Sequence, residues 1–191
     1  PNPPSPFAML FKAFALFKQL KRLQGPGITA AIGAIFLTTF FTLFQAFLKE
    51  KPNIEIFTFS KENNISELSN IVDAIDFIFH LAGVNRTGNK EEFTKGNEKL
   101  TQELCEAIKK TNRKIPVIFS SSIQSKLDNP YGISKNNTEN ILLNFSEDFK
   151  IPIHIFRLPN VFGKWSKPNY NSVVSTFCYN IVRDIPVNIN N

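Results

Sequence analysis

Apolar and polar residues follow one another along residues 50–191 with two periods, one typical of strands and one typical of helices. Apolar runs and apolar alternation predict strands at IEIFTFS (54–60), DFIFHLAG (76–83), PVIFSSS (116–122) and IPIHIFRL (151–158). Helical spacing predicts helices at 66–75, with Ser66 placed to cap it, at about 91–111, and from about Tyr131 to Phe149. Strands that alternate with helices predict an α/β fold, a doubly wound parallel sheet with helices on both faces.

Polar residues collect just after three of these predicted strands. The three groups are Gly83-Val84-Asn85-Arg86, Ser120-Ser121-Ser122 and Arg157-Leu158-Pro159-Asn160. In an open parallel sheet, ligands bind at the carboxyl ends of the strands. The sequence therefore predicts a ligand site along this edge of the sheet.

Residues 1–49 have a different character. A basic amphipathic stretch ends at Gly25-Pro26-Gly27, and Ile28 to Leu48 is a run of 21 residues without charge. Three interpretations stay open: a membrane anchor, for which the run is long enough, a degenerate first βα unit, and non-native sequence from a fusion, an out-of-frame translation or a mis-assembled start. The absence of acidic residues and the abrupt border near residue 50 favour the third interpretation over the second.

Composition and charge exclude several classes of protein. The chain of 191 residues, 42% hydrophobic and 20% charged, can form one domain with a sizeable core but not two full domains. Residues 1–49 carry five of the six net positive charges, so the remainder is close to neutral and no nucleic-acid partner is expected. Cys105 and Cys178 stand far apart and no spacing of His80 or His154 suits a metal, so neither a disulfide nor a metal site is expected.

A chemically specific pattern occurs in SSSIQSKLDNPYGISK, residues 120–135. Tyr131 and Lys135 are four residues apart at the start of a predicted helix, so they project from one face and the ammonium lies close to the phenol. A fixed cation favours the phenolate and moves the pKa of a tyrosine down toward working pH. Together with Ser122 at the end of the neighbouring strand, these residues can polarise a C=O or C–OH group while a hydride moves.

The order of these residues resembles the extended short-chain dehydrogenase/reductase family, which works on nucleotide sugars. HLAG (80–83), the asparagine of KGNEKLTQEL and RLPNVFG (157–163) resemble further motifs of that family. The resemblance implies a Rossmann-like fold in which Ser122, Tyr131 and Lys135 are the catalytic serine, the acid/base and its ribose-binding partner. The cofactor contacts that it implies are Gly33, Leu81, Ala82, Gly83, Asn97, Tyr131, Lys135, Pro159 and Asn160.

Several longer segments narrow the resemblance. LAGVNR, SSSIQ and FGKWSKPNYNSVVSTFCYNI are similar to the bifunctional capsular-polysaccharide reductases of the UDP-N-acetyl-L-fucosamine pathway. The resemblance covers about residues 50–191 and implies NADPH-dependent reduction of the C4 ketone of a UDP-4-keto-6-deoxy-N-acetylhexosamine. It implies a partial reductase domain, truncated in the substrate lobe and without the cupin domain of those enzymes. The implied substrate contacts are Asn85, Arg86, Ser122, Asn160, Lys164, Lys167, Asn169 and Asn171.

The cofactor motif departs from the pattern of the family. ITAAIGAIF stands where a strand and a TGxxGxxG turn are expected, so that Gly33 matches while Ala30 replaces the first glycine and Phe36 the third. Because a phenylalanine at the third position obstructs the contact of helix and strand, impaired NADPH binding is expected. Ser60-Lys61 stand where an acidic residue would hold the NAD ribose, which favours NADPH over NADH.

These features predict a cytoplasmic UDP-sugar reductase that forms a homo-oligomer through helices of the Rossmann domain. A nucleotide-sugar 4-epimerase or 4,6-dehydratase on the same fold is an alternative, although Ile123-Gln124 offers no acid/base pair of the kind a dehydratase would want beside the serine. A further alternative is a non-catalytic remnant of the fold that is anchored in the membrane through residues 28–48 and faces the cytoplasm.

Overall fold

A five-stranded parallel sheet forms the centre of the protein. The computed structural model describes residues 48–50, 54–60, 62–162, 166–170 and 172–189, and the backbone of residues 28–33. The strands are β1 (Ile28–Gly33), β2 (Ile54–Phe59), β3 (Phe77–His80), β4 (Val117–Ser122) and β5 (Ile153–Leu158). Their order across the sheet is β2-β1-β3-β4-β5. This arrangement confirms the predicted α/β fold with a parallel, Rossmann-like sheet.

Strand β1 lies inside the sheet and pairs with a strand on each side. Gly33 is in register with Phe59 of β2 and with His80 of β3. Residues 28–33, the start of the long uncharged run, are therefore extended and take the place that the first strand of a βα unit would take. Most of the rest of residues 1–49, Phe36 included, lies outside the described residues. Among the described residues, no helix is long and apolar enough to cross a membrane.

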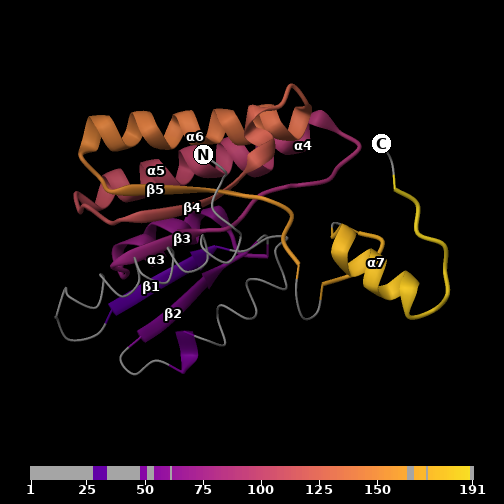
Figure 1. Ribbon diagram of the computed structural model, residues 1–191. Coiled ribbons are helices and arrows are strands. Elements are labelled where there is room, and N and C mark those ends of the chain that lie inside the picture. The colour runs from indigo at the N-terminus through magenta and orange to yellow at the C-terminus, as the bar shows by residue number, and fades with distance from the viewer. Residues whose placement is uncertain are drawn as a thin grey trace, which may run out of the picture.

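Three helices pack on one face of the sheet: α3 (Leu68–Asp73), α5 (Leu100–Thr111) and α6 (Pro130–Phe149). Figure 1 shows α5 and α6 lying side by side along that face. One buried apolar cluster joins them to the strands, with members such as Val72, Ile108, Val117, Phe119 and Leu142. Each of these side chains contributes about 1.5–3 kcal/mol to stability through its burial. The sequence predicts helices on both faces of the sheet, and the described helices cover one face. The link between β1 and β2 lies largely outside the described residues.

Two predicted helices begin or continue differently from the expectation. The predicted helix 66–75 is a 3-10 turn, η1 (Ile65–Glu67), followed by α3, and the capping residue is Asn64 rather than Ser66, whose backbone N–H donates to Asn64 Oδ1 at 3.1 Å. The predicted helix 91–111 consists of α4 (Lys90–Phe93), a π-helical turn η2 (Thr94–Lys99) and α5. Hydrophobic spacing does not reveal a π turn, which is frequent at functional sites.

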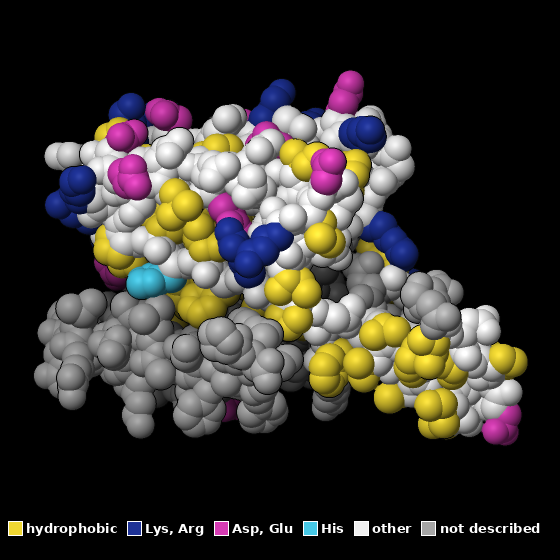
Figure 2. All heavy atoms as spheres, turned by 45° about the horizontal axis from the view of Figure 1, so that its top comes forward, with side chains coloured by type: hydrophobic (Ala, Val, Ile, Leu, Met, Phe, Trp, Pro, Cys, Tyr) yellow, Lys and Arg dark blue, Asp and Glu magenta, His cyan; other side chains and the backbone are white. Residues whose placement is uncertain are grey.

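Helix α7 (Val173–Ile181) has no counterpart among the predicted elements. It lies beyond the carboxyl ends of the strands, apart from the sheet (Figure 1). Ser172 caps it by accepting a hydrogen bond from the Ser175 backbone N–H at 3.2 Å. Hydrophobic side chains gather on the surface of this part of the molecule (Figure 2), and Val173, Ile181 and Val182 are among the exposed ones.

Candidate active site

The site is built where helix α6 starts beside the end of strand β4. Asn129 caps the helix by accepting a hydrogen bond from the Gly132 backbone N–H at 2.8 Å, and Pro130 occupies the first turn. Gly132 packs against the short helix η3 (Ile123–Lys126) and the residue after it: a Cβ atom at this position would overlap Gln124 O and lie 2.6 Å from Leu127 O. The glycine thus lets the start of α6 approach the end of β4.

This close approach brings the three predicted catalytic residues together. The hydroxyl of Ser122, the last residue of β4, shares a hydrogen bond with that of Tyr131 on the first turn of α6. Lys135 Nζ lies 6.0 Å from the centre of the Tyr131 ring and donates a hydrogen bond to Ser120 O at 3.0 Å. One phenol, one hydroxyl and one ammonium therefore share the carboxyl end of β4, as the spacing of the sequence indicates.

The protonation of Tyr131 differs from the expectation. Burial raises the pKa of the Tyr131 phenol, and the hydrogen bond with Ser122 acts in the opposite direction without cancelling it. The prediction that the pKa of Tyr131 lies lower, toward neutral, is therefore wrong, because desolvation of the phenolate is the larger influence. A phenol that keeps its proton at neutral pH is suited to donate it.

Lys135 is buried, with 5% of its surface exposed. Burial lowers the pKa of its ammonium to about 8, while the Glu139 carboxylate acts in the opposite direction. The charged form is further stabilised by the face of the Phe119 ring, whose centre lies 4.8 Å from Lys135 Nζ. The lysine is therefore close to half protonated at slightly alkaline pH.

Asn97, in the π-helical turn, organises the loop that follows strand β3. Its Oδ1 accepts a hydrogen bond from the Val84 backbone N–H at 2.7 Å, and its Nδ2 donates to Val84 O at 3.1 Å. The same Nδ2 donates to Ser134 Oγ at 2.8 Å, and Ser134 in turn donates to Tyr131 O at 2.8 Å. The side chain of Asn97 thus ties the end of β3 to the first turns of α6.

An ion pair between a buried carboxylate and an exposed arginine lies beside the site and was not predicted from the sequence. Glu139 on α6, only 2% exposed, accepts a hydrogen bond from Ser121 Oγ and pairs with Arg157 of β5, whose Nη2 lies 2.6 Å from Glu139 Oε2. Burial alone would raise the pKa of Glu139, but the hydrogen bonds from Arg157 and Ser121 bring it below its usual value. The spacing of four residues between Lys135 and Glu139 was the signal that could have revealed this carboxylate.

Among the predicted substrate contacts, Arg86 and Lys167 lie together. Arg86 Nη1 donates to Tyr170 O at 2.8 Å, and both cations lie near the Tyr170 ring, Arg86 Cζ at 6.0 Å and Lys167 Nζ at 5.8 Å from its centre. The loop after β3 therefore contacts the segment 166–170, although more than 80 residues separate them.

The remaining predicted contacts are more dispersed. Asn85 and Pro159 are half-buried, and Asn160 and Asn169 are exposed. The backbone N–H of Asn169 donates to Thr176 Oγ1 at 2.9 Å, which joins its turn to helix α7. Lys164 and Asn171 lie outside the described residues.

Comparison with known proteins identifies the family of the chain. The model of the NAD dependent epimerase/dehydratase family matches residues 42–190, which is most of the chain. The chain belongs to this epimerase/dehydratase family. The expected membership of the extended short-chain dehydrogenase/reductases is confirmed.

Two relatives combine high coverage of this chain with clear sequence identity. A UDP-2-acetamido-2,6-beta-L-arabino-hexul-4-ose reductase of Pseudomonas aeruginosa is 53% identical over 146 residues, which are 76% of this chain and 39% of that protein. The crystal structure of the capsular polysaccharide assembling protein CapF from Staphylococcus aureus is 34% identical, with a TM-score of 0.70 over 86% of this chain and 43% of that one. This chain therefore spans about two fifths of the length of each relative.

A more distant epimerase structure shares the fold. The UDP-glucuronic acid 4-epimerase from Bacillus cereus in complex with NAD is 20% identical, with a TM-score of 0.70 over 85% of this chain and 66% of that one. At this identity the likeness concerns the fold alone.

The residues present fit the nicotinamide end of the cofactor of an epimerase/dehydratase. Strand order reverses between β1 and β3, the position where open parallel sheets bind their ligands. Leu81 and Ala82 leave β3 there as buried residues, and Gly83 lets the backbone pass close to Lys135, since a Cβ atom at 83 would lie 3.2 Å from Lys135 Nζ. Gly33 ends β1 at the same edge. In the described part of the chain, no group of histidine, cysteine or acidic side chains could hold a metal ion.

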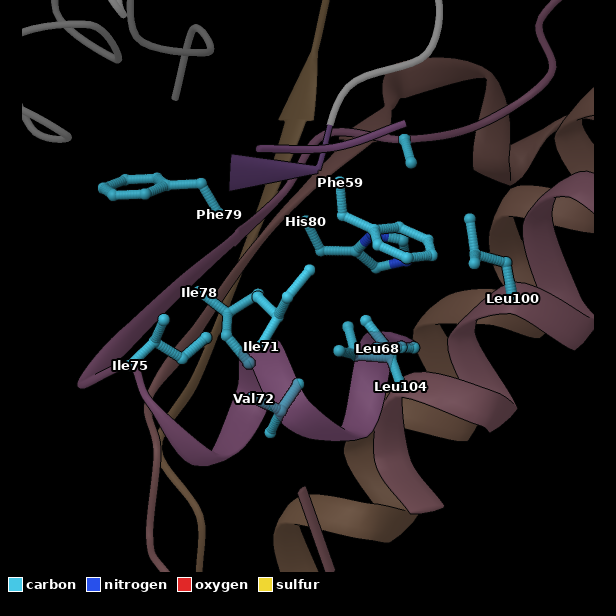
Figure 3. A pocket seen from close by; sticks show the side chains of 11 residues that line it. Phe59, Leu68, Ile71, Val72, Ile75, Ile78, Phe79, His80, Leu100 and Leu104 are labelled. Carbon is cyan, nitrogen blue, oxygen red and sulfur yellow. The ribbon is translucent and has the colours of Figure 1, made fainter. Parts of the chain in front are cut away.

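The histidine of the HLAG motif serves the core. Its Nε2 lies 2.7 Å from Thr101 Oγ1, and because that hydroxyl donates to Asn97 O, the His80 ring is the donor. Burial, and then the charge of Lys135, lowers the pKa of His80 to about 3. The ring lines an apolar cavity of about 40 Å³. Figure 3 shows it among Phe59, Leu100 and Leu104, whereas Phe79 points away. His80 is therefore a neutral packing residue behind the site.

Proposed function

We propose that the protein reduces the C4 ketone of a UDP-4-keto-6-deoxy-N-acetylhexosamine with NADPH, a step in the biosynthesis of a capsular or surface polysaccharide. The observation that carries the proposal is the hydrogen-bonded pair of Ser122 and Tyr131 beside the buried ammonium of Lys135. The names of the Pseudomonas and Staphylococcus relatives support the ketone and the polysaccharide, respectively.

In this proposal each catalytic residue has one task. The residues at the ends of β1 and β3 would hold a nicotinamide, whose chemistry would be the supply of a hydride to the sugar C4 carbon. Tyr131 donates its hydroxyl proton to the C4 oxygen, so that the ketone becomes an alcohol. Ser122 orients that oxygen through its hydroxyl, and Lys135 holds the cofactor ribose and stabilises the phenolate left on Tyr131. The raised pKa of Tyr131 supports this direction of proton transfer, because the phenol starts in its protonated form.

The remaining cofactor contacts belong to the residues that end β1 and β3 and follow β5. These are Gly33, Leu81, Ala82, Gly83, Pro159 and Asn160, with Asn97 holding the loop behind them. The cofactor is NADPH rather than NADH in this proposal, since Ser60 follows β2 where an acid would bind the NAD ribose. Fluorescence titrations that give a lower dissociation constant for NADPH than for NADH are expected.

The substrate lies against the loop after β3 and the segment after β5. Arg86 and Lys167 offer cationic donors for the pyrophosphate, and Asn85, Asn160 and Asn169 offer amides for the sugar. Lys164 and Asn171 are assigned to the same surface from the sequence. The contact of Arg86 with Tyr170 supports this assignment, because it brings both segments to one place. We further propose a cytoplasmic homo-oligomer that contacts through the helices of its sheet domain.

The deciding experiment compares this chain with its Tyr131→Phe variant. We expect the chain to consume NADPH only when the UDP-4-keto sugar is present, and to release the C4 alcohol. Tyr131→Phe keeps the ring and its packing but removes the proton, so turnover should be lost while the NADPH dissociation constant stays within about two-fold. Equal turnover in both proteins would refute the proposed mechanism. With a UDP-hexose that carries a C4 hydroxyl offered in place of the ketone, inversion at C4 without net consumption of nicotinamide would identify a 4-epimerase instead.

A further inference from the structure

Three residues of α6 form a column that faces the end of strand β4. Tyr131, Lys135 and Glu139 are spaced by four residues and so lie on one side of the helix. Each contacts a different serine of β4: Tyr131 shares a hydrogen bond with Ser122, Lys135 donates to Ser120 O, and Glu139 accepts from Ser121 Oγ. Three adjacent residues of β4 thus contact three turns of α6.

We propose that the Glu139–Arg157 ion pair is a positioning device for Lys135, which clamps α6 to β4 and β5 and sets the charge state of the lysine. The proposal rests on the proposed function for the importance of that charge, since Lys135 is there the partner of the acid/base Tyr131. Glu139 and Arg157 are positioning residues, because neither touches the reacting atoms in this scheme.

The geometry of the pair is that of a rigid clamp. Arg157 Nε lies 3.0 Å from both carboxylate oxygens of Glu139, and Nη2 donates to Oε2. A planar guanidinium that binds a carboxylate through two nitrogens fixes orientation as well as charge. Since Arg157 belongs to β5 and Ser121 to β4, the Glu139 carboxylate joins the helix to both strands.

The Glu139 carboxylate is the charge within the column that acts on Lys135. His80 of β3 is neutral near pH 7, Tyr131 of α6 keeps its proton, and Glu139 is the negative charge that favours the ammonium. Arg157 of β5 offsets that negative charge from the other side. Removing either partner of the ion pair should therefore move the protonation of Lys135, and the two removals should move it in opposite directions.

The test is an NMR titration of the full chain with ¹³C-labelled lysine, in which the Lys135 signal is assigned by its loss in Lys135→Met. Glu139→Gln should lower the titration midpoint of Lys135 by about one pH unit, because an attractive charge is lost and Arg157 is left unpaired. Arg157→Gln should raise it by a similar amount. The double variant should return to within about half a unit of the parent.

Two controls separate charge from folding. Arg157→Lys keeps the charge and should leave the titration midpoint of Lys135 near that of the parent. Asp76→Asn removes the exposed ion pair between Asp76 and Arg113, which lies before β3 at the opposite end of the sheet. This second change should not move the midpoint of Lys135. If Glu139→Gln does not fold, Arg157→Gln still decides, since the Arg157 side chain is 42% exposed. Shifts of the same sign in both variants, or no shift in Arg157→Gln, would overturn the proposal.

This readout is independent of turnover. If the midpoints move as expected but Tyr131→Phe remains fully active, the proposed reaction fails and the positioning role stands. If Tyr131→Phe is inactive and the midpoints do not move, the reaction stands and the positioning role fails.

Discussion

Gly83 lies directly against Asn97: a Cβ atom at position 83 would come 2.7 Å from Asn97 Oδ1. The amide cannot withdraw freely, because the same oxygen accepts the Val84 backbone N–H. Lys135 Nζ would also lie close to this Cβ atom, at 3.2 Å. The glycine of the HLAG motif is thus explained by close packing between a backbone and two side chains.

Gly83→Ala should destabilise the protein and weaken NADPH binding. Overpacking of a tight site typically costs about 1–3 kcal/mol, and the displaced amide would move the loop after β3. Urea unfolding and a fluorescence titration with NADPH measure the two effects. Gly88→Ala is a matched control, because a Cβ atom there meets nothing within 4 Å. Equal stability of the two variants would contradict the packing argument.

Asn97→Ala should cost more than a typical helix substitution. The change leaves the Val84 N–H and C=O without their partner and removes a donor to Ser134, and a buried polar group left unpaired costs about 1–3 kcal/mol. We therefore expect a loss of about 2–5 kcal/mol in the free energy of unfolding. Asn140→Ala, at an exposed position of α6, should change stability by less than about 0.5 kcal/mol. Similar losses in both variants would contradict the role of Asn97.

Acid should destabilise the protein through His80. The pKa of this ring is about 3 in the folded protein, whereas an unperturbed histidine has a pKa of 6.5. Between pH 3 and pH 6.5 the unfolded chain therefore binds more protons than the folded protein. The contribution of the neutral His80 ring to the free energy of unfolding is therefore fully present above pH 6.5. It is lost as the pH falls toward 3, at up to about 1.4 kcal/mol per pH unit. His80→Gln should flatten the pH dependence of unfolding in this window and leave it unchanged above pH 7. A slope as steep as that of the parent would refute the assignment.

Turnover should fall as the pH rises through about 8. Lys135 loses its proton there, since burial holds its pKa at that value, and the neutral amine no longer stabilises a phenolate on Tyr131. The pH profile of kcat/KM should show this inflection in the parent. Lys135→Arg keeps a positive charge at all these pH values and should remove the inflection, even if its overall rate is lower. An inflection near pH 8 that persists in the arginine variant would assign it to another group.

Local features of the protein could be predicted because they depend on neighbours in the sequence. Apolar runs in the sequence predict the strands β2 to β5. The helical spacing of apolar residues and the Asn-Pro start predict helix α6. The partnership of Tyr131 and Lys135 follows from a spacing of four residues on a helix. The family resemblance supplied the role of Ser122, which no local pattern encodes.

Contacts between distant segments were decided only by the tertiary structure. Arg157 contacts Glu139, which is 18 residues away in the sequence. Val84 contacts Asn97 over 13 residues, and Arg86 contacts Tyr170 over 84 residues. Burial, too, is a property of the whole fold, which is why the pKa of Tyr131 moves upward although its nearest cation alone would move it downward. The sequence by itself determined that Tyr131 and Lys135 share one face of α6. Folding decided which of them are buried, and burial with its new partners moved the pKa of Tyr131 upward and the pKa values of Lys135 and Glu139 downward.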